Sequence, residues 1–225
     1  MVRYQDRLVG ESAKAYALRE LSENIIKMEL KPGTLISENE LSRILGVSRT
    51  PIREAIQELV KAQLIEVFPQ RGSYVAAISF DAVEEAAFLR RTLEAAIVEE
   101  LCDNITDDQL KKLYENIGLQ EYYLNNNMSE KIMNLDNEFH EMLFMMCGKE
   151  QTYRLMHSAM GQFDRMRALS LYSIKDIKVV SDHRDIADAI AKGEKDTARA
   201  LMIKHLMRYK LDKEEVIKEY PDYFK

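Results

Sequence analysis

The stretch GVSRTPIREA, residues 46–55, decides the fold of the first third of the chain. Gly46 is a natural stop for a short helix before it, because glycine accepts the left-handed conformation that often ends a helix. Ser48 is placed to cap the next helix, whose first turn tolerates Pro51. That helix has an apolar inner stripe, made by Ile52, Ala55, Ile56, Leu59 and Val60. Two helices joined by a tight turn that contains glycine make a helix-turn-helix.

The flanking residues indicate a winged form of this motif. Upstream, residues 12 to about 29 carry apolar side chains at helical spacing. Ser37 followed by Glu40 is a capping box for the helix that ends near residue 45. Downstream, strand-forming residues at 64–68 and 73–76 flank a Pro-Gln-Arg-Gly turn. We therefore expect residues 1–76 to form a winged helix-turn-helix domain.

The start of the second helix is where a helix-turn-helix meets the base edges and phosphates of DNA. Arg49 and Arg53 are four residues apart and share one helix face, and each guanidinium can bind a guanine edge or a phosphate through two N–H groups. Glycine at the wing tip lets the backbone approach DNA closely. The candidate DNA-binding residues are Ser48, Arg49, Thr50, Arg53, Arg71 and Gly72. The same arginines could instead be ordinary solvated charges.

The net charge of −6 is spread unevenly. Residues 1–76 hold 11 Lys and Arg against 10 Asp and Glu, a net charge of +1, and residues 77–225 hold 21 against 28, a net charge of −7. Only the first third can approach a phosphate backbone without general repulsion.

The composition is that of a globular protein, with 46% apolar and 31% charged residues. No apolar run reaches the ~18 residues of a membrane span, and the N-terminus lacks the apolar core of a signal peptide. We therefore expect a cytoplasmic protein. Cys102 and Cys147 are far apart in sequence, so a disulfide framework is not expected.

The rest of the chain reads as helices only. We expect residues 77–80 to be a linker and residues 81–225 to be an antiparallel all-α bundle, which makes the whole fold mainly α. Gly148 and Gly193 fall between periodic segments as helix breakers. The expected helices are 81–103, 107–126, 129–147, 150–171, 175–191 and 194–216.

Helical projection places one aspartate and three of the four histidines on buried faces. Asp136 and His140 lie four residues apart within the apolar arc of one expected helix, and His183 and His205 lie on the apolar stripes of two others. His157 projects away from the apolar arc of its helix and reads as a surface residue. Arg165 and Arg167 lie on an expected helix of the bundle and could reach its interior, but a solvated face is the simpler interpretation.

An aspartate on a buried face is costly unless it is paired or bound to a metal. One Asp and three His ligands suit a divalent transition metal such as Zn²⁺, Ni²⁺ or Mn²⁺. A buried polar network without metal, or coincidence, would account for the same pattern. The residues alone leave these alternatives open.

The stretch from about residue 25 to 76 closely resembles the GntR family of bacterial regulators, and the run GVSRTPIREA is highly specific for that family. The resemblance implies that the residues matching Arg49, Arg53 and Gly72 contact operator DNA. Two departures are visible. The family often has glycine where this chain has Met28-Glu29, and it often has Glu-Gly-Leu where this chain has Ala62-Gln63-Leu64.

Four further segments resemble the FCD effector domain of the FadR subfamily: Arg90–Glu94, Asp136-x-x-x-His140, Asp182–Ile186 and Ala198–Leu206. The resemblance implies a bundle of six or seven helices, dimerisation, and a pseudo-palindromic operator. It also implies that Asp136, His140, His183 and His205 hold a Zn²⁺- or Ni²⁺-like ion that coordinates a small organic-acid or sugar-acid effector. Arg90 is the candidate partner for the effector's carboxylate, although it could instead be a surface charge or pair with a nearby glutamate.

The sequence therefore favours a ligand-responsive, DNA-binding transcriptional regulator over an enzyme. Three other hypotheses share the same residues. The protein could sense the metal directly, the metal could be only structural, or the Asp/His₃ set could serve a metalloenzyme with an open coordination position.

Overall fold

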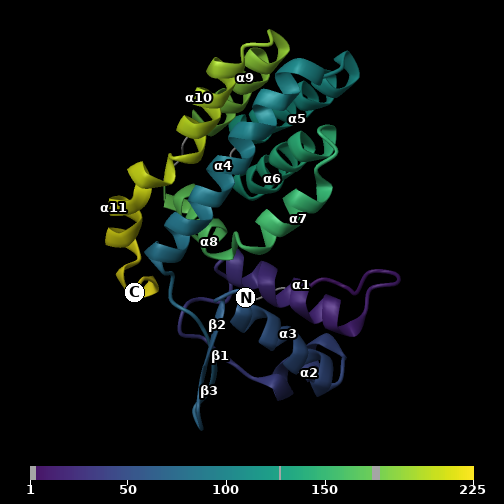
Figure 1. Cartoon of the computed structure of the whole chain (residues 1–225). Coiled ribbons are helices and arrows are strands. Elements are labelled where there is room, and N and C mark those ends of the chain that lie inside the picture. Colours follow the sequence, from purple (N-terminus) through teal and green to yellow (C-terminus); the bar gives the residue numbers. More distant parts are fainter. Residues whose placement is uncertain (1–3, 127, 174–177) are drawn as a thin grey trace. The chain divides into compact units, whose positions relative to one another are not determined.

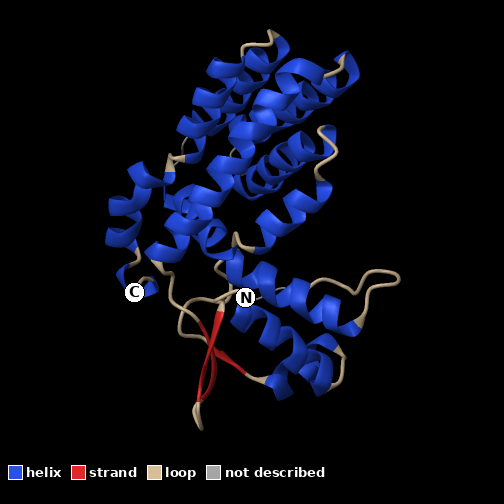
Figure 2. Cartoon of the chain, in the orientation of Figure 1, coloured by secondary structure: helices blue, strands red, loops and turns tan. Residues whose placement is uncertain are grey.

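The computed structural model describes residues 4–126, 128–173 and 178–225. Contacts divide the chain into two compact units. The first unit comprises residues 1–84, 158–169 and 217–225, and the second comprises residues 85–157 and 170–216. The fold is mainly helical with one small sheet, as the sequence predicts (Figure 2).

The N-terminal part has the elements of a winged helix-turn-helix. Its helices are α1 (Ala13–Ile26), α2 (Glu38–Leu45) and α3 (Arg49–Lys61), and its strands are β1 (Leu35–Ile36), β2 (Ile65–Phe68) and β3 (Gly72–Val75) (Figure 1). The sheet is antiparallel, in the order β1-β3-β2, with Val67 opposite Ser73 and Leu35 opposite Tyr74. The hairpin of β2 and β3 is the wing.

Apolar stripes and caps explain these helices. Helices α1 and α3 pack on each other, and their contact faces supply fully buried side chains: Leu21, Ile25, Ile52, Ala55 and Leu59. At the start of α1, the Ser12 hydroxyl accepts a hydrogen bond from the backbone amide of Ala15. Gly46 ends α2 with φ +65°, the left-handed conformation expected of it.

Capping by Ser48 is the exception. Its backbone has the extended conformation of a cap residue, but among the described residues its hydroxyl makes no capping hydrogen bond. The expected side-chain cap of α3 is therefore wrong. Pro51, which has no N–H group to satisfy, lies in that first turn.

The two departures from the family pattern coincide with unusual backbone. Met28 has φ +61° and Gln63 has φ +57°, so both take the left-handed conformation that costs a side-chain-bearing residue about 1–2 kcal/mol. Glycine takes this conformation freely. The backbone path thus suits the glycines that the resemblance leads us to expect at these two positions.

Helices make up the remainder of the chain: α4 (Phe80–Asn104), α5 (Asp107–Asn125), α6 (Ser129–Met146), α7 (Glu150–Ser158), α8 (Gly161–Ser173), α9 (Lys178–Ala191), α10 (Lys195–Leu206) and α11 (Tyr209–Glu219). Within the second unit, α5 packs on α6 and α9, and α9 packs on α10. Of the expected helix 175–191, residues 175–177 lie outside the described part.

Two expected helices are each divided in two. The predicted helix 150–171 is interrupted before Gly161, where an added Cβ would lie 3.1 Å from Leu64, so glycine permits a close approach. The predicted helix 194–216 is interrupted at residues 207–208, where Met207 closes the last turn by bonding back to Ile203 and Lys204. Apolar spacing continues across both breaks, which is why periodicity alone missed them.

The C-terminal segment, to which the sequence assigns no role, pairs with the expected linker. Ile78 and Phe224 form a parallel bridge, in which the Ile78 amide donates to Tyr223 O at 2.8 Å and the Lys225 amide donates to Ile78 O at 3.1 Å. The rings of Phe80 and Phe224 stack at 4.9 Å. These contacts all lie within the first unit.

Among the described residues, no helix combines the length and the apolar character needed to cross a membrane.

Candidate functional site

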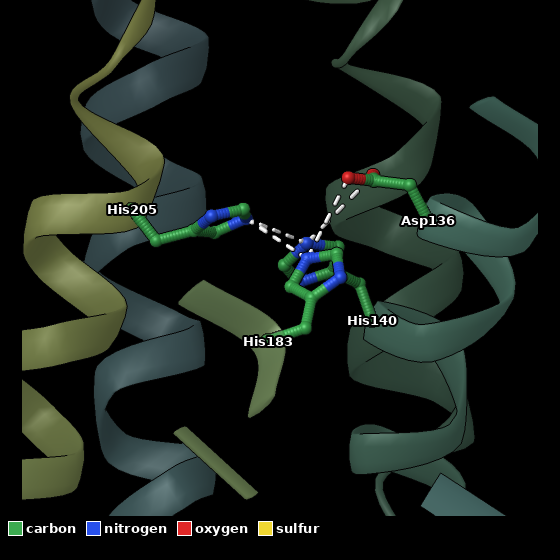
Figure 3. A group of neighbouring side chains, drawn as sticks. All are labelled: Asp136, His140, His183 and His205. Carbon is green, nitrogen blue, oxygen red and sulfur yellow. Dashed lines mark hydrogen bonds and ion pairs between the residues drawn. The ribbon is translucent and has the colours of Figure 1, made fainter. Parts of the chain in front are cut away.

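Four buried side chains converge in the second unit. Asp136 and His140 project from α6, His183 from α9 and His205 from α10, and the imidazoles point toward one another (Figure 3). His205 Nε2 lies 3.2 Å from His140 Nε2 and 3.2 Å from His183 Nε2. The Asp136 carboxylate lies 3.8 Å from His140 Nε2 and 3.6 Å from His183 Nε2. The structure thus brings together all four residues that the sequence selects.

The spacing of these atoms fits a metal ion. Metal–nitrogen bonds of about 2.0–2.1 Å in a tetrahedron place neighbouring ligand atoms about 3.3–3.4 Å apart. The observed separations of 3.2 to 3.8 Å bracket that value. The four residues are between 0% and 7% exposed, so their polar atoms have little access to solvent. This cluster could hold a metal.

His140 is oriented by a carboxylate from α4. Its Nδ1 atom lies 2.5 Å from Glu94 Oε2, and Glu94 Oε1 accepts a 2.6 Å hydrogen bond from Arg90 Nε. Glu94 is fully buried. Because a carboxylate accepts hydrogen bonds, Nδ1 of His140 carries the proton, and its Nε2 lone pair faces the cluster.

His183 is oriented by an amide chain from α5. Its Nδ1 atom lies 2.8 Å from Gln120 Oε1, Gln120 Nε2 donates to Asn116 Oδ1 at 2.6 Å, and Asn116 Nδ2 donates to Leu135 O at 3.2 Å. The carbonyl of Leu135 can only accept a hydrogen bond, so it fixes the donor and the acceptor in each hydrogen bond of this series. Nδ1 of His183 therefore donates, and its Nε2 lone pair also faces the cluster.

His205 has an acidic neighbour on α9. Its Nδ1 atom lies 3.4 Å from Asp182 Oδ2, an ion-pair distance that is long for a hydrogen bond. Asp182 also accepts two hydrogen bonds from Arg208, one from Nε to Oδ2 and one from Nη2 to Oδ1 at 2.8 Å. Burial raises the pKa of Asp182, but the contacts with His205 and Arg208 outweigh it and hold that pKa well below its usual range.

These partners leave Nε2 lone pairs pointing at one another. A single proton on His205 Nε2 could bridge to His140 or His183, which is the metal-free network left open by the sequence. A divalent ion would satisfy every lone pair at once, and histidine ligands almost always donate their other N–H to a carboxylate, carbonyl or water. Burial also lowers the pKa of His183 well below 6.5, with further lowering by His205, so this imidazole is neutral as a ligand must be.

Arg90 lies close to the cluster but already has a partner. It is 4% exposed, it pairs with Glu94 as described, and its charge contributes to the lowered pKa of His183. The alternative of a pairing with a nearby glutamate is therefore present in the structure.

Two other residues test the projection of the helices. His157 is exposed on α7, as predicted. Arg165 is fully buried, so its reading as a solvated charge is wrong, and burial lowers its pKa to about 10. Its Nη1 atom lies 3.4 Å from Gln162 Oε1, whereas Nε and Nη2 have no hydrogen-bond partner among the described residues. Arg167 pairs with Asp164 at 2.9 Å.

The candidate DNA-binding residues lie at the start of α3 and at the wing tip. Ser48, Arg49, Thr50 and Arg53 are all exposed at the N-terminal end of α3. This end carries the positive end of the helix dipole, which favours phosphate. Arg49 and Arg53 both pair with Glu38, the first residue of α2.

The two wing-tip candidates lie where the hairpin turns, with Arg71 before β3 and Gly72 as its first residue. Arg71 is exposed, with its guanidinium 5.8 Å from the centre of the Phe68 ring. Gly72 has φ +109°, and an added Cβ would lie 3.1 Å from Leu35. A larger residue would therefore be strained and crowded here.

A glutamate partner for Arg90 was among the alternatives that the sequence left open, whereas the partners of the imidazoles and of Arg49 and Arg53 emerge only from the structure. Glu94 lies four residues after Arg90, and Asp182 adjoins His183, so local spacing contained a signal for both. Gln120 and Glu38 carry no such signal, because each meets its partner only through the packing of separate helices.

Comparisons with known proteins match two regions of the chain to known families. Residues 14–75 match the family described as bacterial regulatory proteins, gntR family, and residues 85–208 match the FCD domain. The chain is 30% identical to the HTH-type transcriptional repressor RspR of Escherichia coli, over 92% of this chain and 91% of the relative. It is 32% identical to an uncharacterised HTH-type regulator of Streptomyces ambofaciens, over 91% of this chain and 86% of the relative.

Solved structures support the fold. E. coli McbR/YncC superposes with a TM-score of 0.74 at 20% identity, covering 93% of this chain and 99% of that one. A GntR regulator from Rhodococcus has a TM-score of 0.75 at 23% identity, covering 92% of this chain and 98% of that one. The role comes instead from the matched gntR family and from the 30%-identical repressor RspR, which are transcriptional regulators and weigh against a metalloenzyme.

Proposed function

The chain belongs to the GntR family of bacterial regulatory proteins and is a DNA-binding transcriptional regulator with an FCD domain, and from this premise we propose that a metal-dependent effector site controls its affinity for operator DNA. The observation that carries the proposal is the convergence of three imidazole Nε2 atoms and one carboxylate in a buried cluster. We place its action in the cytoplasm, where operator DNA is found.

The proposed DNA-binding residues are Ser48, Arg49, Thr50, Arg53, Arg71 and Gly72. Their exposure and the left-handed backbone of Gly72 support this assignment. The protein acts as a homodimer on a pseudo-palindromic operator, because a two-fold pair of recognition helices matches half-sites about one helical turn apart. The proposed domain boundaries are 1–76 for DNA binding, 77–80 for the linker and 81–225 for the effector domain.

Asp136, His140, His183 and His205 would hold the ion, and Zn²⁺ or Ni²⁺ suits an Asp/His₃ donor set. When bound, the ion supplies a Lewis acid that attracts the carboxylate of a small organic-acid or sugar-acid effector. Arg90 contributes a buried positive charge beside the cluster, which favours the same anion. Glu94, Gln120 and Asp182 orient the three imidazoles.

The effector changes operator affinity only through its differential affinity for two states of the protein. Couplings of this kind are typically about 1–3 kcal/mol, or about 5–150-fold in affinity. An effector at the cluster must therefore change the dissociation constant for DNA by a factor in that range.

The near-complete burial of the cluster favours one second candidate, a structural metal. Structural sites are closed by protein ligands, and a cluster between 0% and 7% exposed has that character. Direct sensing of the metal is the third possibility. If the metal is structural, the effector response of the holo-protein is independent of the metal ligands. If the protein senses the metal directly, the metal alone changes DNA affinity.

DNA binding measured under three conditions separates these functions. The operator duplex is titrated with chelated protein, with protein plus Zn²⁺ or Ni²⁺, and with metal-loaded protein plus a panel of small carboxylates. The proposal expects a change in affinity only when both metal and a carboxylate are present. A response to metal alone indicates a metal sensor, and no carboxylate response in a metal-loaded, folded protein refutes effector binding by this class of ligand.

The DNA-reading assignment has its own test. We expect Arg49→Ala to weaken operator binding, whereas full operator affinity in this variant would contradict the assignment.

A further inference from the structure

The two arginines proposed to read DNA share one carboxylate. Glu38 Oε1 and Oε2 accept hydrogen bonds from Arg53 Nε at 3.1 Å and Arg53 Nη2 at 2.9 Å. Arg49 Nη2 lies 3.3 Å from the same Oε2 atom. The side chains of both arginines are 57% exposed and that of Glu38 is 27% exposed, so the triad lies on the surface of the first unit.

The geometry of the Arg53 contact matters for base recognition. A guanidinium has two edges that offer a pair of donors, one formed by Nε and Nη2 and the other by Nη1 and Nη2. Glu38 engages the Nε edge. The Nη1–Nη2 edge can donate to O6 and N7 of a guanine while the carboxylate contact persists.

We propose that Glu38 is a specificity-determining residue that orients Arg53 for base reading and competes with DNA phosphates for both arginines. The inference rests on the proposed DNA-reading role of Arg49 and Arg53. It adds an acidic residue outside the recognition helix to that function.

The competition acts differently on matched and unmatched DNA. A phosphate that binds either arginine non-specifically must share it with a carboxylate of the same charge, which opposes the association. A guanine edge carries no net charge and approaches from the other side of the fork, so it meets less of this opposition. Hydrogen bonds from Arg53 and Arg49 lower the pKa of Glu38, so the carboxylate keeps its charge at neutral pH.

An exposed ion pair contributes little to folding stability, typically under about 1 kcal/mol. Glu38→Gln is therefore expected to fold normally, and its effects on DNA binding can be measured directly. The matched control is Glu40→Gln, because Glu40 is exposed in the same first turn of α2 and carries the same charge. Both variants change the net charge equally.

The experiment compares two duplexes for each variant, one selected by the wild-type protein from a randomised library and one of scrambled sequence. Dissociation constants are measured by fluorescence anisotropy over a series of salt concentrations. We expect Glu38→Gln to bind the scrambled duplex more tightly than the wild type does. The ratio of its affinity for the selected duplex to that for the scrambled duplex should fall about tenfold, because a good bidentate base contact discriminates by about that factor. The salt slope for the scrambled duplex should steepen by about 0.9 for each added phosphate contact. Glu40→Gln should keep the wild-type ratio.

Two failures are distinguishable. A wild-type ratio in Glu38→Gln, or an equal fall in Glu40→Gln, overturns the role of Glu38. Full affinity of Arg53→Ala for the selected duplex contradicts instead the proposed reading role on which the inference rests.

Discussion

Replacing Glu94 by glutamine should weaken metal binding without touching a ligand. The Glu94 carboxylate is fully buried and lies 2.5 Å from His140 Nδ1. A glutamine either offers its oxygen to Nδ1 as a weaker, neutral acceptor, or it offers its NH₂ group and forces the proton onto Nε2. Both outcomes make the Nε2 lone pair of His140 a poorer ligand.

The expected magnitude follows from this geometry. Loss of such an outer partner typically costs about 10–100-fold in metal affinity, which is about 1.4–2.8 kcal/mol. The substitution also removes the charge that faces Arg90 at 2.6 Å, and breaking a buried ion pair costs about 3–5 kcal/mol of folding stability. Native domains have about 5–15 kcal/mol in total, so the variant should be destabilised but still folded at low temperature.

The assay is a competition titration of Zn²⁺ against a chromophoric chelator at pH 7, with circular dichroism to confirm folding. Glu99→Gln is the control, because Glu99 lies on the same helix and pairs at the surface with Arg199 at 3.1 Å. Its metal affinity should equal that of the wild type. If folded Glu94→Gln protein binds Zn²⁺ within twofold of the wild type, orientation of His140 by Glu94 is not part of the site.

Three further predictions concern stability. Tyr114→Phe removes a 2.6 Å hydrogen bond to Asp188 and should lower the free energy of unfolding in urea by about 1–3 kcal/mol. Burial and this bond raise the pKa of Tyr114 to about 12, so the loss of stability should be complete below pH 10 and vanish as the pH rises through 12. A loss of stability that grew with pH would contradict this prediction. Gln63→Gly relieves a φ of +57° and should raise the free energy of unfolding by about 0.5–1 kcal/mol, whereas a fall of that size would show that the conformation carries no strain. Deleting residues 221–225 removes the acceptor of the Ile78 amide, so hydrogen exchange at that amide should accelerate at least about tenfold, and unchanged exchange would mean that the bridge does not form.

The sequence predicted the fold class and the four cluster residues because their signals are local. A turn with glycine between two short amphipathic helices, and an aspartate four residues before a histidine on one apolar face, are properties of short segments. Asp136 and His140 could be paired from spacing alone. Their convergence with His183 and His205 required only that each residue faces inward in one bundle.

Partners that meet through tertiary packing could not be predicted in this way. Gln120 meets His183, and Glu38 meets Arg49 and Arg53, each from a separate helix. The periodicity of the sequence carries no signal for these contacts. Arg165 was misread because a charged side chain is usually exposed, whereas tertiary packing buries this one completely. The pairing of Ile78 with Phe224 joins segments that are 146 residues apart in the sequence.

The metal content of each chain decides whether the buried Asp/His₃ cluster is a metal site. The protein is purified without chelator, supplied with Zn²⁺ or Ni²⁺, and assayed by elemental analysis beside His140→Ala and His157→Ala, the latter changing an exposed histidine outside the cluster. We expect about one ion per chain in the wild type and in His157→Ala, and loss of that ion in His140→Ala. No bound ion in any of the three proteins would contradict it, and the cluster would then be a buried polar network.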